Sequence, residues 1–175
     1  MTPKPSPSPT SPAPTPVVPR GNLLANASLE SSLAPWSTWH GTVRRSPADD
    51  APDGRRVARV RFDGVGTAFS LGHLGRRVAA ARAGVALQAQ AHVRAGSSRA
   101  VGKPLAIYVR ETTPSGRLVQ RVRGSIVRLG AEFVPLRATL TPRSRHNRVD
   151  VLLVQRRAAA GDVFLADALS LTRGS

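Results

Sequence analysis

The chain has 175 residues, and its 26 Lys and Arg against 10 Asp and Glu give a formal net charge of +16. It has no cysteine, which excludes disulfides, thiolate nucleophiles and zinc–thiolate sites. Its hydrophobic content of 41% suffices for one core at this length, but only 4% of the residues are aromatic, so Val, Leu and Ala must fill most of that core.

Residues 1–20 have the composition of a linker. From Thr2 to Pro19, prolines alternate with Ser, Thr and Ala, which removes backbone donors and offers nothing to bury. The pattern predicts a disordered, extended linker between modules, with a plain disordered terminus as the alternative. Setting aside Lys4 and Arg20 leaves 24 basic and 10 acidic residues, a net charge of +14, on a predicted single domain at 21–175.

Targeting signals are missing from the sequence as given. The residues after Met1 form no apolar segment of the signal-peptide kind, and no stretch of about 20 apolar residues occurs, so we expect no membrane span. If the domain is extracellular or on the cell surface, we expect this chain to be a fragment or to lack its true start.

Short segments with alternating polarity recur along residues 21–175, separated by Gly, Pro, Asp and Ser. The clearest lies at 85–94, where Val, Leu and Ala alternate with Gln, His and Arg. Residues 74–83 form the one short helical candidate. The pattern predicts an all-β, two-sheet antiparallel β-sandwich. The expected strands are 36–45, 56–62, 67–72, 84–95, 104–111, 117–123, 125–129, 132–140, 148–156 and 163–172.

Three segments carry a resemblance to a known group. The domain begins with NLLANASLE at 22–30 and PWS at 35–37, continues with DGRRVA at 53–58, and ends with FLADALSL at 164–171. In order and spacing these segments resemble carbohydrate-binding modules of families four, nine and twenty-two, which are galactose-binding-like jelly rolls. The resemblance implies a jelly-roll fold and a secreted, monomeric module of a larger protein that binds carbohydrate. It also implies that Leu29 is an apolar plug and that Trp36 belongs to the core.

The same group often holds a structural calcium ion where the first and last strands meet. The resemblance places Glu30 and Asp167 at its carboxylate positions, with Asp53 as a third carboxylate and the carbonyls of Ser28 and Arg56 completing an oxygen shell. The alternative is that Glu30 caps a turn and Asp167 pairs with an arginine.

Candidate ligand-binding residues follow from outward polar and aromatic positions. Amides, a guanidinium and an aromatic ring suit sugar hydroxyls or the carboxylate of an acidic sugar. We expect the outward face of segment 85–94 to continue through the segment at 104–111, with a solvated sheet face as the alternative. The predicted ligand-binding residues are Trp39, Gln88, Gln90, His92, Arg94, Tyr108 and Arg110.

No nucleophile elbow, zinc-protease motif or phosphate loop occurs in the sequence, so we expect no enzyme activity. The sequence predicts a non-catalytic module that attaches to a polysaccharide or cell-surface glycan, acidic sugars included. Two alternatives stay open: a structural or adhesion β-sandwich without a sugar site, and a basic domain that binds polyanions or nucleic acid through charge. Because nearly every cation is arginine, a GC-rich coding sequence explains the charge equally well.

Overall fold

The structure is a computed structural model that describes residues 21–73 and 83–174. The expected linker at 1–20 and all but the last residue of the helical candidate at 74–83 lie outside the described residues.

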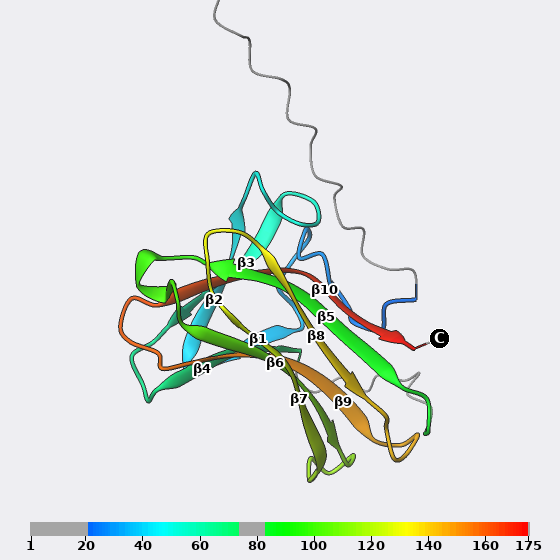
Figure 1. The fold of residues 1–175 in the computed structure, drawn as a ribbon. Helices are drawn as coiled ribbons and strands as arrows, with labels where there is room; N and C mark the ends of the chain where they lie inside the picture. The colour runs from blue at the N-terminus through cyan, green and yellow to red at the C-terminus, as the bar shows by residue number, and fades with distance from the viewer. Residues whose placement is uncertain (1–20, 74–82, 175) are drawn as a thin grey trace, which may run out of the picture.

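Two antiparallel five-stranded sheets pack face to face, as Figure 1 shows, which confirms the predicted all-β jelly-roll sandwich. Sheet A has the order β1 (Trp36–Trp39), β4 (Ala68–His73), β9 (Arg148–Arg156), β6 (Pro104–Thr112) and β7 (Leu118–Arg128). Sheet B has the order β2 (Gly41–Pro47), β3 (Arg56–Phe62), β10 (Val163–Arg173), β5 (Leu87–Ala95) and β8 (Val134–Leu140). A single turn of 3-10 helix, η1, spans Ser98–Ala100.

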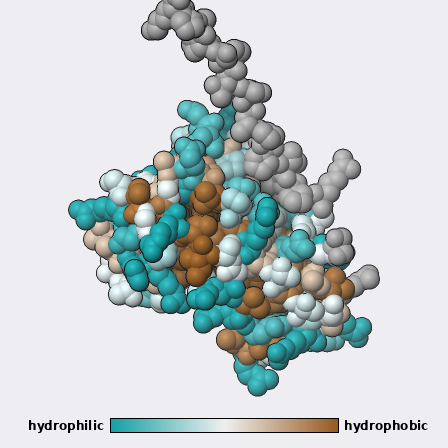
Figure 2. Space-filling model, viewed as in Figure 1, coloured by the Kyte–Doolittle hydropathy of each residue, from teal (hydrophilic) through white to brown (hydrophobic). Residues whose placement is uncertain are grey.

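The core lies between the sheets and is mainly aliphatic, as the composition requires. Alternate residues of each strand point inward, so Phe69 on β4 and Phe164 on β10 meet with ring centroids 5.2 Å apart. Leu29 is fully buried and Trp36 is 5% exposed, which confirms both expectations. On the outside of the domain, the face shown in Figure 2 is mostly hydrophilic, although an apolar strip crosses it. In the part of the chain that is described, no helix is long and apolar enough to span a membrane.

Two strand boundaries differ from the prediction. The expected strand 36–45 is two strands in different sheets, because the chain turns at His40, which has a φ of 53°, and at Gly41. A Cβ at Gly41 would lie 2.7 Å from the carbonyl oxygen of Arg61, so this crossing needs glycine. The expected strands 117–123 and 125–129 form one strand, β7, whose register shifts opposite Ala106–Tyr108. Gly124 lies within that irregularity.

The beginning and the end of the domain are joined. The side chain of Asn22 donates to the Leu169 carbonyl at 3.0 Å and accepts from the Leu171 amide at 2.9 Å, and the Leu23 amide donates to the Leu171 carbonyl at 2.8 Å. The entry segment at 22–30 is thereby fixed beside β10.

Candidate functional site

A groove of about 1040 Å³ runs across the outer face of sheet A, and we call it the sheet A groove. Its floor is formed by small and apolar side chains of three central strands. Its rim carries the exposed ring of Trp39 and several arginines. The arginines are Arg110, Arg121, Arg128, Arg156 and Arg157.

Strand register explains the flat, apolar floor. Trp39 on β1 lies opposite Ser70 on β4, which lies opposite Val154 on β9, which lies opposite Ala106 on β6. These residues form one row across four strands that are about 4.8 Å apart. Short side chains in this row leave the space that the groove occupies.

The arginines lie at both ends of this floor. Arg110 and Arg121 are paired across β6 and β7, and Arg128 is paired with Pro104 at the other end of the same two strands. Six residues of β6 separate the two ends, a distance of about 20 Å at 3.3 Å per residue. Of the five groove arginines, only Arg110 forms an ion pair among the described residues, with Asp150 at 2.9 Å.

Tyr108 points toward the groove but is not the open stacking ring that we expected. It is only 6% exposed, because the Arg121 guanidinium lies 5.5 Å from its ring centroid and Arg156 donates to its hydroxyl at 3.3 Å. Trp39 is 56% exposed and meets the ring of His40 edge-on at 3.9 Å between centroids. The aromatic face that a ligand can reach here is therefore that of Trp39.

The remaining predicted ligand residues lie on the other side of the molecule. Gln88, Gln90, His92 and Arg94 point outward from β5 in sheet B, whereas Tyr108 and Arg110 belong to β6 in sheet A. The expectation of one continuous face was wrong, because strands consecutive in sequence joined different sheets.

The polar residues of β5 already contact neighbouring side chains. Gln90 accepts from Arg137 at 3.3 Å, and Arg94 pairs with Asp50 at 3.1 Å while lying over the ring of Phe133. Burial, and secondarily the charge of Arg137, lowers the pKa of His92, so His92 is neutral at pH 7.

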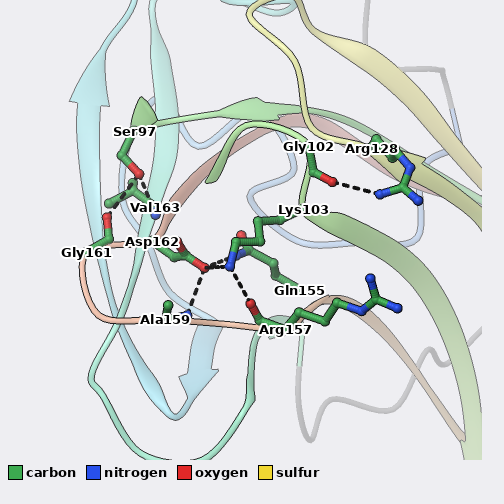
Figure 3. A network of polar contacts seen from close by, with 10 residues as sticks. All are labelled: Ser97, Gly102, Lys103, Arg128, Gln155, Arg157, Ala159, Gly161, Asp162 and Val163. Atoms are coloured by element: carbon green, nitrogen blue, oxygen red, sulfur yellow. Dashed lines mark hydrogen bonds and ion pairs between the residues drawn. The ribbon is translucent and has the colours of Figure 1, made fainter. Parts of the chain in front are cut away.

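A buried network fixes the loop that carries Arg157 (Figure 3). Asp162 has no exposed surface, and its Oδ2 accepts from the Gln155 amide group at 2.8 Å and from the Ala159 backbone amide at 3.0 Å. The ammonium group of Lys103 lies 3.8 Å from the same oxygen and donates to the Arg157 carbonyl at 2.7 Å.

The neighbouring loop is held in the same region. Arg128 donates to the Gly102 carbonyl at 3.1 Å, one residue before Lys103 (Figure 3). The network thus holds the backbone of Arg157, and the side chain of Arg128 is held by the carbonyl next to Lys103, which reduces the entropy lost on binding a ligand.

The three carboxylates predicted as metal ligands lie near one another, where Glu30 and the loop at 48–55 meet Asp167 of β10. Asp167 is fully buried, and its Oδ2 accepts from the Asp53 amide at 2.8 Å while its Oδ1 has no hydrogen-bond partner. Glu30 caps the turn at 54–56, since its Oε1 accepts from the amides of Arg55 and Arg56 at 2.9 and 2.6 Å. The expected alternative for Glu30 is thus observed, whereas Asp167 forms no ion pair within the described part of the chain.

Electrostatic repulsion marks this cluster. Burial raises the pKa of Asp167 to about 7, against the hydrogen bonds from the Asp53 and Ala168 amides, and the charges of Asp53 and Glu30 raise it further. Burial, and then Glu30, also raises the pKa of Asp53. An oxygen-seeking cation would offset this repulsion. As arranged, however, no group of three His, Asp or Glu among residues 21–73 and 83–174 is close enough to hold a metal ion.

Four groove arginines were not among the predicted ligand-binding residues, although strand alternation marks three of them as outward. Arg121 and Arg128 lie on β7 and Arg156 on β9, each at an outward position of an alternating strand. Arg157 lies on the following loop and could not be placed from alternation.

The comparisons with known proteins support the fold. No protein-family model matches the sequence. No curated protein matches it. Solved structures do: the enzymatically active domain of tailspike protein 4 of bacteriophage CBA120 has a TM-score of 0.66 and 13% identity, over 87% of this chain but 21% of that one. This chain therefore spans about a fifth of the tailspike domain.

Two carbohydrate-binding modules match over nearly their whole length. The CBM22-1 xylan-binding domain of Xyn10C from Paenibacillus barcinonensis has a TM-score of 0.62 and 13% identity, over 89% of this chain and 97% of that domain. TmCBM61, solved in complex with β-1,4-galactotriose, has a TM-score of 0.59 and 17% identity, over 87% and 99%. The fold is therefore that of the β-sandwich carbohydrate-binding modules. Membership of families four, nine and twenty-two stays a prediction.

Proposed function

We propose that this domain is a non-catalytic module that binds an acidic polysaccharide or cell-surface glycan in the sheet A groove. One observation carries the proposal: an exposed tryptophan and an apolar floor lie between arginines that, apart from Arg110, form no ion pair among the described residues. The carbohydrate-binding modules that share the fold support the sugar class.

Each part of the groove suits a different part of such a ligand. The face of Trp39 can stack on the apolar face of a pyranose ring, and the floor near Val154 offers further apolar contact. The planar guanidinium groups of Arg121 and Arg128 can hold carboxylates through two parallel hydrogen bonds. A volume of about 1040 Å³ exceeds that of typical small-molecule pockets, which favours an oligosaccharide over a single sugar.

The context we propose is an extracellular or cell-surface one. Residues 1–20 would connect the module to another domain, and the module would bind as a monomer. This role needs no chemistry from the module itself, since its task is to hold the rest of the protein at a glycan.

We also propose that calcium binds between Glu30, Asp53 and Asp167, with the carbonyls of Ser28 and Arg56. The support is the unpartnered, fully buried Oδ1 of Asp167 and the repulsion among the three carboxylates. Because no three of these carboxylates are close enough to hold an ion as arranged, their side chains would reorient on binding, and the ion would add to the contacts that already join segment 26–31 to the loop at 48–55. The ion's effect would therefore be on stability.

Titration calorimetry with defined oligosaccharides tests the groove. We expect hexagalacturonate to bind and neutral xylohexaose and galactotriose to bind more weakly. Replacing Arg121 and Arg156 together by Gln removes charge-assisted hydrogen bonds worth about 1.5–3 kcal/mol each, so affinity should fall at least tenfold. Arg117, exposed in the turn after β6, provides the matched control as Arg117→Gln.

Salt dependence separates this function from the alternatives. A domain that binds polyanions only through counterion release loses affinity for them steeply as the salt concentration rises. Such a domain binds DNA as readily as it binds a chain of uronic acids. If DNA binds and hexagalacturonate does not, the basic polyanion-binding alternative replaces our proposal. If neither ligand nor any neutral sugar binds, a structural or adhesion domain is the better description.

A further inference from the structure

A second basic hollow lies on the opposite sheet, which the groove does not explain. It has a volume of about 280 Å³ on the outer face of sheet B, and we call it the sheet B pocket. Three arginines and two hydroxyl-bearing residues line it, together with the start of β10. The lining includes Thr42, Arg44, Arg59, Arg61, Ser97 and Gly161.

Strand pairing brings the three arginines together. Arg44 on β2 lies directly opposite Arg59 on β3, and Thr42 lies opposite Arg61. Arg59 and Arg61 share the outward face of β3 and are about 7 Å apart along the strand. Like charges directly opposite on neighbouring strands are destabilising.

No carboxylate of the described residues neutralises this cluster. The basic residues that form ion pairs among the described residues are Arg94, Lys103 and Arg110, and none of them lines the pocket. Among the described residues, the Arg59 side chain donates only to the Gly96 carbonyl, at 3.3 Å. Asp63, the first residue after β3, accepts from the Val65 amide in its own turn at 2.8 Å.

The wall of the pocket is built from fixed backbone. The hydroxyl of Ser97 donates to the Gly161 carbonyl at 3.0 Å and accepts from the Val163 amide at 3.1 Å, as Figure 3 shows. Asp162, between those two residues, is held by the buried network described above. The backbone that faces the arginines is therefore already in place before a ligand binds.

From this geometry we infer that the sheet B pocket binds a carboxylate or sulfate group of a second glycan chain. The pocket is too small for an oligosaccharide but suits one anionic group, which three guanidiniums can hold while their mutual repulsion is relieved. Because the groove and the pocket lie on outward faces of opposite sheets, the module would hold two polyanionic chains and cross-link them. The glycan identity rests on the proposed function, whereas the anion pocket does not.

Calorimetric stoichiometry with hexagalacturonate and with a heparin-derived hexasaccharide tests the inference. Wild type should bind two oligosaccharides per chain. The pocket variant Arg44→Gln with Arg61→Gln should bind one, the groove variant Arg121→Gln with Arg156→Gln should bind one, and the control Arg117→Gln should bind two. The two oligosaccharides show whether carboxylate or sulfate fills the pocket, and either result supports the inference. Melting temperatures should show that the pocket variant is as stable as wild type, since it loses only repelling charges.

The outcomes separate the two proposals. A pocket variant with the stoichiometry and affinities of wild type for both oligosaccharides overturns the inference, and so does a control that loses a site, because binding would then follow total charge. A groove variant that behaves as wild type while the pocket variant loses a site overturns the proposed function alone. Light scattering with long polygalacturonate gives a second readout: wild type and control should cross-link the polymer, whereas both double variants should bind it without cross-linking.

Discussion

Replacing Glu111 by Gln should destabilise the domain strongly, although Glu111 lies in neither binding site. Its carboxylate is fully buried at the end of β6 and accepts from the side chains of Gln120 and Asn147, both at 2.6 Å, and from the backbone amides of Arg143 and Ser144. The loop between β8 and β9 is held mainly by these bonds.

The magnitude follows from the number of donors. All of these donors now bond to one negatively charged carboxylate. A glutamine would place its own NH2 group, also a donor, against some of them, so at least one charge-assisted hydrogen bond is lost and a buried donor is left unpaired. Such losses cost about 3 kcal/mol together, or about 6–12 °C in melting temperature for a domain of this size.

The pH dependence has a definite sign. Burial alone would raise the pKa of Glu111, but the hydrogen bonds from Asn147, Gln120 and the two amides outweigh it and lower the pKa. Its stabilisation is therefore fully present above the unfolded-state pKa, near 4.5, and is lost as the pH falls through the folded-state value. Urea unfolding followed by circular dichroism should show wild type and Glu111→Gln converging at low pH.

Glu132, which is exposed, supplies the control for the same substitution. Glu132→Gln should change the free energy of unfolding by less than about 0.5 kcal/mol. If Glu111→Gln is no less stable than Glu132→Gln at pH 7, the buried carboxylate does not hold the loop and the reasoning fails.

Four further predictions concern the groove, the carboxylate cluster and the packing of β7. Trp39→Ala should weaken hexagalacturonate binding about 5- to 30-fold in calorimetry with an unchanged melting temperature, because the ring is exposed; an unchanged affinity would remove Trp39 from the site. Arg121→Lys keeps the charge but loses the planar fork, so affinity for hexagalacturonate should fall while low-salt DNA binding stays the same; equal losses would contradict specific carboxylate recognition. Calcium should raise the melting temperature of wild type above its value in chelator, and Asp167→Ala should abolish that response; a wild type indifferent to calcium contradicts the site. Gly124→Ala should cost about 1–3 kcal/mol in urea unfolding, because its Cβ would lie 2.1 Å from the Arg137 carbonyl oxygen; unchanged stability would mean that β7 and β8 separate easily.

Alternation along the chain was enough to predict which side chains of a strand face the core. The pattern at 85–94 placed Val85, Leu87, Ala89, Ala91 and Val93 inward. The last four are buried, whereas Val85 precedes β5 and is only half-buried. The entry motif likewise placed Leu29 and Trp36 in the core. The prediction for the strand succeeds because the two-residue period of a strand is a local property of the backbone, whereas the placement of Leu29 and Trp36 came from the resemblance.

Alternation could not predict which strands share a sheet, and the expectation of one continuous face through segments 85–94 and 104–111 was wrong for that reason. β5 pairs with β8 and β10, while β6 pairs with β7 and β9, so the outward residues of β5 and β6 face opposite directions. Pairing depends on contacts between residues far apart in the sequence. Tyr108 shows a second limit, because its burial under Arg121 and Arg156 depends on side chains from two other strands.

Arginine content alone does not distinguish a GC-rich coding sequence from a surface selected for binding, but arginine placement is informative. A bias in the coding sequence adds arginine at any solvent-exposed position. It has no preference for positions that line a groove or pocket, or that lie on backbone fixed by hydrogen bonds. Here Arg157 lines the sheet A groove on the loop fixed by the Lys103–Asp162 network, and Arg128, at the end of β7, donates to the Gly102 carbonyl next to Lys103. The pocket on the opposite sheet gathers three more arginines against a wall fixed by the same loop. One buried acidic residue, Asp162, thus supports cationic sites on both outer faces. Burying a carboxylate is costly unless it is paired and hydrogen-bonded, as Asp162 is by Lys103, Gln155 and the Ala159 amide, and the loop that these contacts fix is the one on which both arginine clusters depend.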